Sequence, residues 1–229
     1  MGRVGAFLFV LICAATSVGV AGATTSPKSL RAAILQAVSA EDSAHYVVTD
    51  SGRGFSTSMV CDVAAGRGIQ RITIVRSGRT GHVTVLVADS RAYFRGDSFG
   101  LHAYMGLSAS QASRDAGRWL VVSHSSSAYA SIAADVTFAS FASHLVPKAH
   151  LALVSATLAG RKLVGVRGTT QEEGLTVTNA VYAPKSGTRL PAEATAVIPG
   201  PQGGTGRTTI SKWNEQVRVQ APAHATPIY

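Results

Sequence analysis

Apolar and polar residues alternate with a period of two through most of the stretch from His45 to Arg95. Such alternation is typical of β-strands that bury one face. Short turns such as Ser51-Gly52 and Ser77-Gly78-Arg79 separate the runs. Connections this short join antiparallel neighbours, because a parallel crossover needs about a dozen residues. The pattern therefore predicts a meander of strands at residues 45–50, 56–64, 68–76, 81–89 and 91–95.

The chain leaves this pattern and later returns to it. Short helical segments between residues 97 and 117 precede a strand at 118–120, and apolar residues at helical spacing occupy 123–145. Residues 30–38 also have an apolar helical stripe, behind Ser29 as a suitable N-cap. Further strands are expected at residues 150–157, 162–170, 174–182, 190–198 and 206–213. Together these elements predict an α+β domain, in which about ten antiparallel strands form one curved sheet with helices packed on its concave face.

Alternation also indicates which side chains face the helices. Val83, Val85 and Val87 form one apolar row, and Val164 and Val166 form another. The helices are too few to cover so long an apolar face, so we expect part of it to line a cavity. The expected cavity walls are Ile72, Ile74, Val83, Val85, Val87, Phe94, Leu101, Tyr104, Trp119, Val164 and Val166. A shift of one residue would turn a strand's row to the other face.

The first residues have the pattern of an export signal. Arg3 precedes an apolar run over residues 4–20, and Ala21-Gly22-Ala23 supplies the small residues that signal peptidase requires. Cys13 lies in the middle of the apolar run, directly behind Ile12. This context disfavours a lipid anchor at Cys13. We therefore expect an exported protein, either secreted or held in the cell envelope.

The domain organisation that follows is simple. Residues 1–23 are expected to be a signal peptide, 24–220 a single domain, and 221–229 a Pro- and Ala-rich tail lying loosely on the surface. Cleavage leaves Cys61 as the one cysteine of the mature chain, which therefore has no internal disulfide. Its position beside Met59 and Val60 indicates a small buried residue, not a reactive thiol.

The formal net charge of +9 favours anionic partners. In an exported protein these would be lipid head groups, envelope polymers or an anionic membrane surface. The arginines and lysines are scattered singly, without the basic helix or the interleaved aromatics that indicate nucleic-acid binding. We expect no nucleic-acid partner and a monomeric protein.

The motif Gly96-Asp97-Ser98-Phe99-Gly100 satisfies the G-x-S-x-G pattern of serine hydrolases. That motif belongs on a parallel α/β sheet, whereas the strands here are expected to be antiparallel. Glu193 and His224 could complete a triad in chain order, but His224 lies in the tail, where nothing would orient it. The competing interpretation is a turn whose polar residues cap the next helix.

Other candidate chemistry is weaker. The histidines are spread singly, without the spacing of a zinc site. The Glu172-Glu173 pair lies at an expected hairpin turn. We therefore expect no metal, no cofactor and no enzymatic activity. Trp119 and Trp213 each follow a basic residue and could be core anchors or the rim of the cavity. Candidate hinges for movement of the helical insertion are Gly96, Gly100, Gly106 and Gly117.

Several short runs carry a resemblance to a known family: Ala92-Tyr93-Phe94-Arg95-Gly96, Gly106-Leu107-Ser108, Gly117-Arg118-Trp119, and Ser211-Lys212-Trp213-Asn214-Glu215 followed by Val217 and Ala221-Pro222. The pattern resembles actinobacterial envelope lipoproteins of the LppX/LprG type. The resemblance implies a LolA-like half-open antiparallel β-barrel whose helices plug its mouth. It also implies a carrier that holds the acyl chains of a lipid or lipoglycan in an apolar cavity. A secreted esterase using Ser98 and a non-binding structural envelope protein are the alternatives.

Overall fold

The computed structural model describes residues 26–172, 175–200 and 203–228, so the expected signal peptide and Cys13 lie outside the described residues. The strands are β1 (Ser43–Gly52), β2 (Phe55–Ala64), β3 (Arg67–Arg76), β4 (Arg79–Ala88), β5 (Arg91–Gly96), β6 (Leu120–Ser123), β7 (Ala149–Leu158), β8 (Arg161–Glu172), β9 (Leu175–Pro184), β10 (Glu193–Ile198), β11 (Gly204–Ser211) and β12 (Thr226–Pro227). The helices are α1 (Pro27–Ser39), α2 (Ser98–Ala103), α3 (Ala109–Asp115), α4 (Ser127–Val136) and α5 (Phe138–Leu145).

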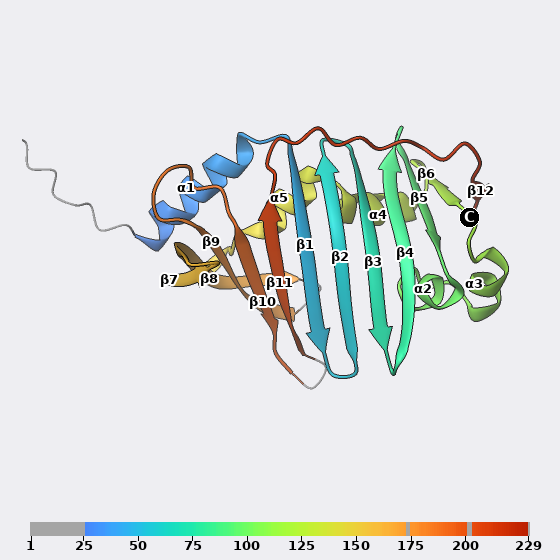
Figure 1. The fold of residues 1–229 in the computed structure, drawn as a ribbon, viewed down its shortest axis with the longest axis horizontal. Coiled ribbons are helices and arrows are strands. Elements are labelled where there is room, and N and C mark those ends of the chain that lie inside the picture. Colours follow the sequence, from blue (N-terminus) through green and yellow to red (C-terminus); the bar gives the residue numbers. More distant parts are fainter. Residues whose placement is uncertain (1–25, 173–174, 201–202, 229) are drawn as a thin grey trace, which may run out of the picture.

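All the described strands belong to one sheet, in the order β12-β6-β5-β4-β3-β2-β1-β11-β10-β9-β8-β7. Neighbouring strands are antiparallel except for β12, which runs parallel to β6. Strands β12 and β7 are the two ends of this order, so the sheet is open (Figure 1). The expected α+β class is confirmed, with twelve strands rather than about ten. Both expected meanders are present, and β1 of the first pairs with β11 of the second.

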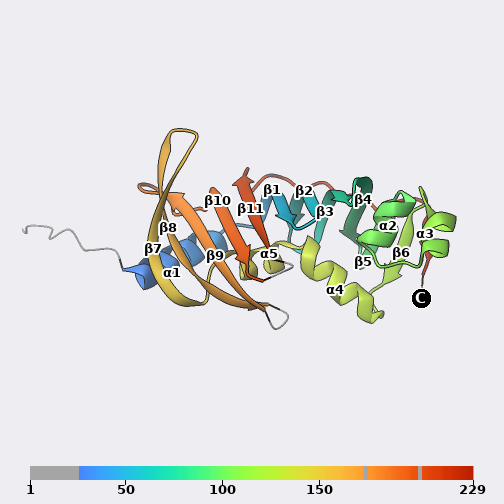
Figure 2. The same cartoon turned by 90° about the horizontal axis from the view of Figure 1, so that it is seen from below.

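The two faces of the sheet differ in what covers them. We call the face that carries Val85 and Phe94 the front face, and the one that carries Leu86 and Tyr93 the back face. The five helices each place apolar side chains in the front-face core. In Figure 2, strands β7 to β10 curve around α1, while α4 and α5 lie along the central strands. The front face is therefore the covered, concave one.

Helix α1 begins earlier than expected. Its N-cap is Ser26, whose side-chain oxygen accepts a hydrogen bond from the backbone N–H of Ser29. The side-chain oxygen of Ser29 in turn accepts one from the backbone N–H of Ser26. Pro27 occupies the first turn, where its missing N–H costs nothing. Ser29 is thus the third residue of the helix and not its cap. Leu30, Ile34 and Val38 are buried, as the apolar stripe predicted.

The second helical region is broken where one continuous stretch was expected. Thr137 has an extended backbone and separates α4 from α5, so the two helices can follow different directions along the curved sheet. The C-terminal tail also differs from the expectation of a loose surface segment. Thr226 and Ile228 donate backbone hydrogen bonds to the carbonyls of Trp119 and Val121, which adds β12 to the sheet. The tail crosses the strand ends from β11 to β6 (Figure 1).

The glycines of the helical insertion fall into two kinds. Gly106 and Gly117 have positive φ angles of 70° and 77°, which a side chain would strain. Gly96 and Gly100 instead allow close packing, because a Cβ atom on either would lie 2.5 Å from the carbonyl oxygen of His82. Tight packing against β4 explains these two glycines without a hinge. A hinge role for the insertion stays a prediction.

Candidate functional site: a cleft between helix α5 and the sheet

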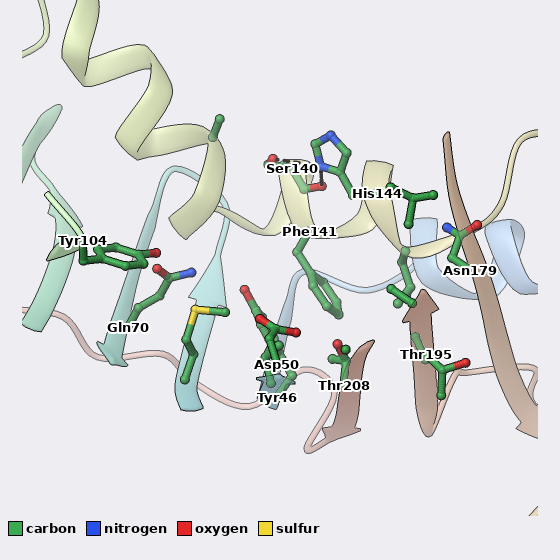
Figure 3. A pocket seen from close by; sticks show the side chains of 18 residues that line it. Tyr46, Asp50, Gln70, Tyr104, Ser140, Phe141, His144, Asn179, Thr195 and Thr208 are labelled. Carbon is green, nitrogen blue, oxygen red and sulfur yellow. Dashed lines mark hydrogen bonds between the residues drawn. The ribbon is translucent and has the colours of Figure 1, made fainter. Parts of the chain in front are cut away.

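The front-face core consists of two packed clusters that meet at one residue. One cluster lies beneath α1 and α5 and includes Tyr46 and Val166. The other lies beneath α2 and α4 and includes Val85 and Phe94. Met59 on β2 packs against both. A cleft of about 390 Å³ opens beside Met59, between α5 and the central strands (Figure 3).

The lining of this cleft is mainly apolar with a minority of polar groups. Strands β1, β2, β9, β10 and β11 supply most of the floor, and α5 supplies the roof. The apolar members are Tyr46, Val48, Met59, Tyr104, Ala134, Phe141, Leu145, Val177, Ala194, Ala196 and Gly206. The polar members are Asp50, Gln70, Ser140, His144, Asn179, Thr195 and Thr208. A mostly apolar wall with a few polar groups is typical of a small-molecule site.

Aromatic side chains connect helix α5, above the cleft, to strand β1 below it. The ring of Phe141 on α5 stacks on the ring of Tyr46 on β1, and Trp213 contacts both Phe138 and Phe141. The indole N–H of Trp213 donates to the carbonyl oxygen of Pro191 at 3.2 Å, so its polar group is satisfied. Trp213 is therefore a core anchor behind the cleft, one of the two roles expected for it.

The polar groups of the cleft are held in place by different means. Asn179 on β9 is buried, and its side-chain N–H donates to the Thr170 hydroxyl at 3.2 Å. Asp50 on β1 is partly buried, and burial raises the pKa of its carboxyl above the usual 3.8. A raised pKa means that the folded protein disfavours the negative charge at this position.

Cys61 lies beneath the cleft and not in its wall. Its side chain is fully buried and makes hydrogen bonds with the side chains of Tyr46 and Gln70. Burial raises the pKa of the thiol to about 12, so the nucleophilic thiolate is scarcely populated at neutral pH. The prediction that Cys61 is a small buried core residue is confirmed.

A second hollow continues from the cleft toward one end of the sheet. Its volume is about 690 Å³, and it shares Tyr104 with the cleft. We call it the outer basin; its lining residues are Arg53, Phe55, Thr57, Ile74, Arg76, Ala103 and Tyr104. The polar and charged share of this lining is larger than in the cleft. The front face therefore has an inner, mainly apolar space and an outer space with arginines at its border.

The sequence-predicted cavity residues are distributed over several places. Ile72, Ile74, Val83, Val85, Val87, Phe94 and Leu101 belong to the cluster beneath α2 and α4. Tyr129 and Ile132 of α4 pack against this cluster, so protein side chains already occupy much of the space in front of it. Val164 and Val166 belong to the cluster beneath α1 and α5. Tyr104 lines both the cleft and the outer basin, and Ile74 lines the outer basin.

Trp119 faces the other side of the sheet. Leu120 and Val122 of β6 pack in the front-face core, so the odd-numbered neighbours point to the back face. There Trp119 packs with Leu86 and Tyr93, and the guanidinium of Arg95 lies 5.8 Å from the centre of its ring. The prediction that Trp119 lines the cavity is wrong, because the alternation along this segment turns Leu120 and Val122, and not Trp119, to the front face.

The GDSFG motif forms a helix cap. Asp97 is the N-cap of α2, and its two carboxylate oxygens accept from the backbone N–H groups of Gly100 and His82, each at 2.7 Å. Ser98 is exposed at the start of this six-residue helix. Within the described part of the chain, its hydroxyl has no hydrogen bond to a histidine. Glu193, the expected acid, is bound to Arg207 at 2.9 Å. The capping interpretation of this motif is confirmed.

Sequence reasoning missed most of the cleft. Val48 and Asp50 lie on β1, and Ala194 and Thr208 lie on the strands that reach β1 from the far end of the sequence. The sequence shows the alternation of β1, but the residues of β1 that face the cleft are a tyrosine, a valine and an aspartate, which do not form an apolar pattern. Pairing between β1 and β11 brings these residues together, and that pairing has no local sequence signal.

An open antiparallel sheet with its helices on one face and a cleft beneath them defines a half-barrel of the α+β class. The crystal structure of the lipoprotein LppX of Mycobacterium tuberculosis is similar to this fold, at a TM-score of 0.50 and 18% sequence identity over 84% of this chain and 99% of that chain. A LolA superfamily protein from Nitrosomonas europaea aligns with 85% of this chain and 95% of that chain, at a TM-score of 0.34 and 10% identity. The fold of this protein is thus similar to that of LppX, which confirms the predicted resemblance at the level of the fold.

A scan against protein-family models finds no match, and neither does a sequence search of curated proteins. Among residues 26–172, 175–200 and 203–228, no helix is long and apolar enough to cross a bilayer.

Proposed function

We propose that the protein is an exported carrier of the bacterial cell envelope that holds an acyl chain of a lipid or lipoglycan in the cleft beneath α5. The observation that carries this proposal is the gap between the two packed clusters, where the front face is lined by Val48, Met59 and Phe141 but is not filled. A cleft of about 390 Å³ lies within the range of about 300–1,000 Å³ typical of small-molecule sites.

The energetics of such a site need no catalytic group. Each methylene that moves from water into an apolar cleft contributes about 0.8 kcal/mol, so a chain of ordinary length gains ample affinity. The polar groups at Asp50, Asn179 and Thr208 would then meet the part of the lipid nearest the head group. The expected signal peptide and the LppX-like fold agree with a role in the envelope. Among the described residues the exposed Ser98 has no hydrogen bond to a histidine, so it gives no support to an esterase.

The test is organic extraction of the natively purified protein, followed by mass spectrometry of the extract. We expect stoichiometric acyl lipid from the unaltered chain and its loss from Thr208→Trp, since Thr208 lines the cleft. Thr209→Trp is the matched control, because the next residue of β11 points to the back face and is exposed. The control should keep its lipid.

An extract without lipid, together with no uptake of a fluorescent fatty acid by the purified protein, would overturn the proposal. The structural envelope protein would then be the better account. Equal loss of lipid from both tryptophan variants would overturn the location of the site instead, provided that both variants unfold at the same denaturant midpoint as the unaltered chain.

A further inference from the structure

Two hairpin turns and the paired ends of β10 and β11 lie at one end of the sheet. The strand register aligns Gly52 with Phe55 and Phe55 with Arg76 across β1, β2 and β3. On the other side of β1, Gly52 aligns with Gly204, which in turn pairs with Ile198 at the end of β10. The β1–β2 and β3–β4 connections and the paired ends of β10 and β11 are therefore neighbours, along the lower border of the sheet in Figure 1. We call this border the turn end.

Exposed apolar side chains gather at the turn end. Among the large hydrophobic side chains of the described residues, seven are exposed to a substantial degree. Leu153 on β7 and Leu175 at the start of β9 lie outside the strands that meet at the turn end. The other five are Phe55, Val75, Tyr104, Val197 and Ile198. Phe55 lies on the front face, whereas Val75 and Val197 lie on the back face, as their registers require. They form a rim around the end of the sheet and not a flat patch on one face.

Three arginines stand among these apolar residues. Arg53 belongs to the β1–β2 turn, and Arg76 and Arg79 flank the β3–β4 turn. All three are exposed, and within the described part of the chain none of them forms a salt bridge. The Arg79 guanidinium lies 4.4 Å from the centre of the Phe99 ring, and Arg53 and Arg76 border the outer basin. The positive charge at this end is therefore available to an external anion.

We propose that the turn end docks on the surface of an anionic lipid bilayer. Arginine side chains match lipid phosphates, and exposed aromatic and aliphatic side chains favour the boundary between head groups and acyl chains. The apolar side chains of the rim point to both faces of the sheet. A lipid bilayer is fluid, so it can contact side chains on both faces at once. A protein partner would need a complementary rigid surface on both faces.

Docking in this way would place the outer basin, and behind it the cleft, against the bilayer. An acyl chain could then pass from the membrane along Tyr104 to the cleft without crossing water. This route for an acyl chain rests on the proposed function, whereas attachment of the turn end to the bilayer does not require a lipid in the cleft. The two proposals can therefore fail separately.

The experiment is co-sedimentation of the mature protein with vesicles of phosphatidylglycerol and phosphatidylcholine in equal parts, compared with vesicles of phosphatidylcholine alone. The test variant is R53E/R76E/R79E. The matched control is R67E/R91E/R161E, which changes the net charge equally but places the substitutions at exposed hairpin positions of the opposite strand ends. We expect the test variant to bind the anionic vesicles at least about tenfold more weakly, and the control to bind like the unaltered chain.

Phe55→Ser should also weaken vesicle binding, and Thr208→Trp should leave it intact, because Thr208 lies in the cleft and away from the rim. Equal losses in the two triple variants would overturn the proposal, since binding would then depend on overall charge. Failure of the unaltered chain to bind anionic vesicles would overturn it as well; if lipid were still extracted from the protein, the carrier function would stand and docking through a protein partner would replace the bilayer.

Discussion

The ring of Phe141 stacks on the ring of Tyr46 with their centroids 4.3 Å apart and their planes inclined by 11°. Phe141 belongs to α5 and Tyr46 to β1, so this one contact joins the roof of the cleft to its floor. Both residues line the cleft (Figure 3). The stack therefore sets the height of the space beneath α5, and it links the stability of the fold to the capacity of the site.

Replacing Phe141 with alanine should lower the free energy of unfolding by about 2–3 kcal/mol, because the side chain is partly buried and loses its aromatic partners. The same change should weaken the binding of a fluorescent fatty acid, since the roof loses its main apolar surface. Denaturant titration and fluorescence titration measure the two effects. Ser143→Ala on the exposed side of α5 is the control and should alter neither. Unchanged probe binding in Phe141→Ala would show that the cleft is not the acyl site.

Replacing Gly100 with alanine should destabilise the protein by about 2–4 kcal/mol, although alanine is the better helix former. The added Cβ would lie 2.5 Å from the backbone carbonyl oxygen of His82, so α2 would have to move away from β4. Thermal unfolding followed by circular dichroism is the measurement. Ser98→Ala in the same helix should change stability by less than about 0.5 kcal/mol, since Ser98 is exposed. A Gly100→Ala protein as stable as Ser98→Ala would contradict the close packing of α2 on the sheet.

Replacing Asp50 with asparagine should increase stability at neutral pH and not in acid. The pKa of Asp50 is raised in the folded protein, so the native state binds this proton more tightly than the unfolded state does. The stabilising contribution is complete below the usual pKa of 3.8 and is lost as the pH rises through the folded pKa. The difference in unfolding free energy between Asp50→Asn and the unaltered chain should therefore grow with pH across this window. A difference that shrinks with rising pH would contradict burial of the carboxyl.

The strands of this protein could be predicted well because each is a local pattern. Period-two alternation placed β1 to β5 and β7 to β11 within a few residues of their observed bounds, and the row of Val83, Val85 and Val87 packs on one face as expected. The order of the strands was not predictable in the same way. No local feature indicates that β1 lies beside β11, or that the Pro-rich tail ends as strand β12.

The candidate site was harder to predict, because its position depends on which part of the front face the helix side chains leave uncovered. The apolar rows around Val85 were the natural choice for a cavity wall, but Tyr129 and Ile132 of α4 pack against them. The cleft lies instead between the end of α4, helix α5 and strand β1. The β1 residues that line it, Tyr46, Val48 and Asp50, are not uniformly apolar. Trp119 was assigned to the wrong face, because a strand as short as β6 has too few alternating residues to indicate which set faces the helices.

The position of β1 has a consequence for the way the molecule is made. It is the first strand of the described residues, yet it lies between β2 and β11, and its register pairs Tyr46 with Ile210. Because the chain is made from its N-terminus, one edge of β1 can pair with β2 early, but the other edge stays unpaired until β11 has been made. An unpaired edge is prone to join other chains. We therefore expect the nascent first meander to depend on a holding chaperone, and the last strands to release it.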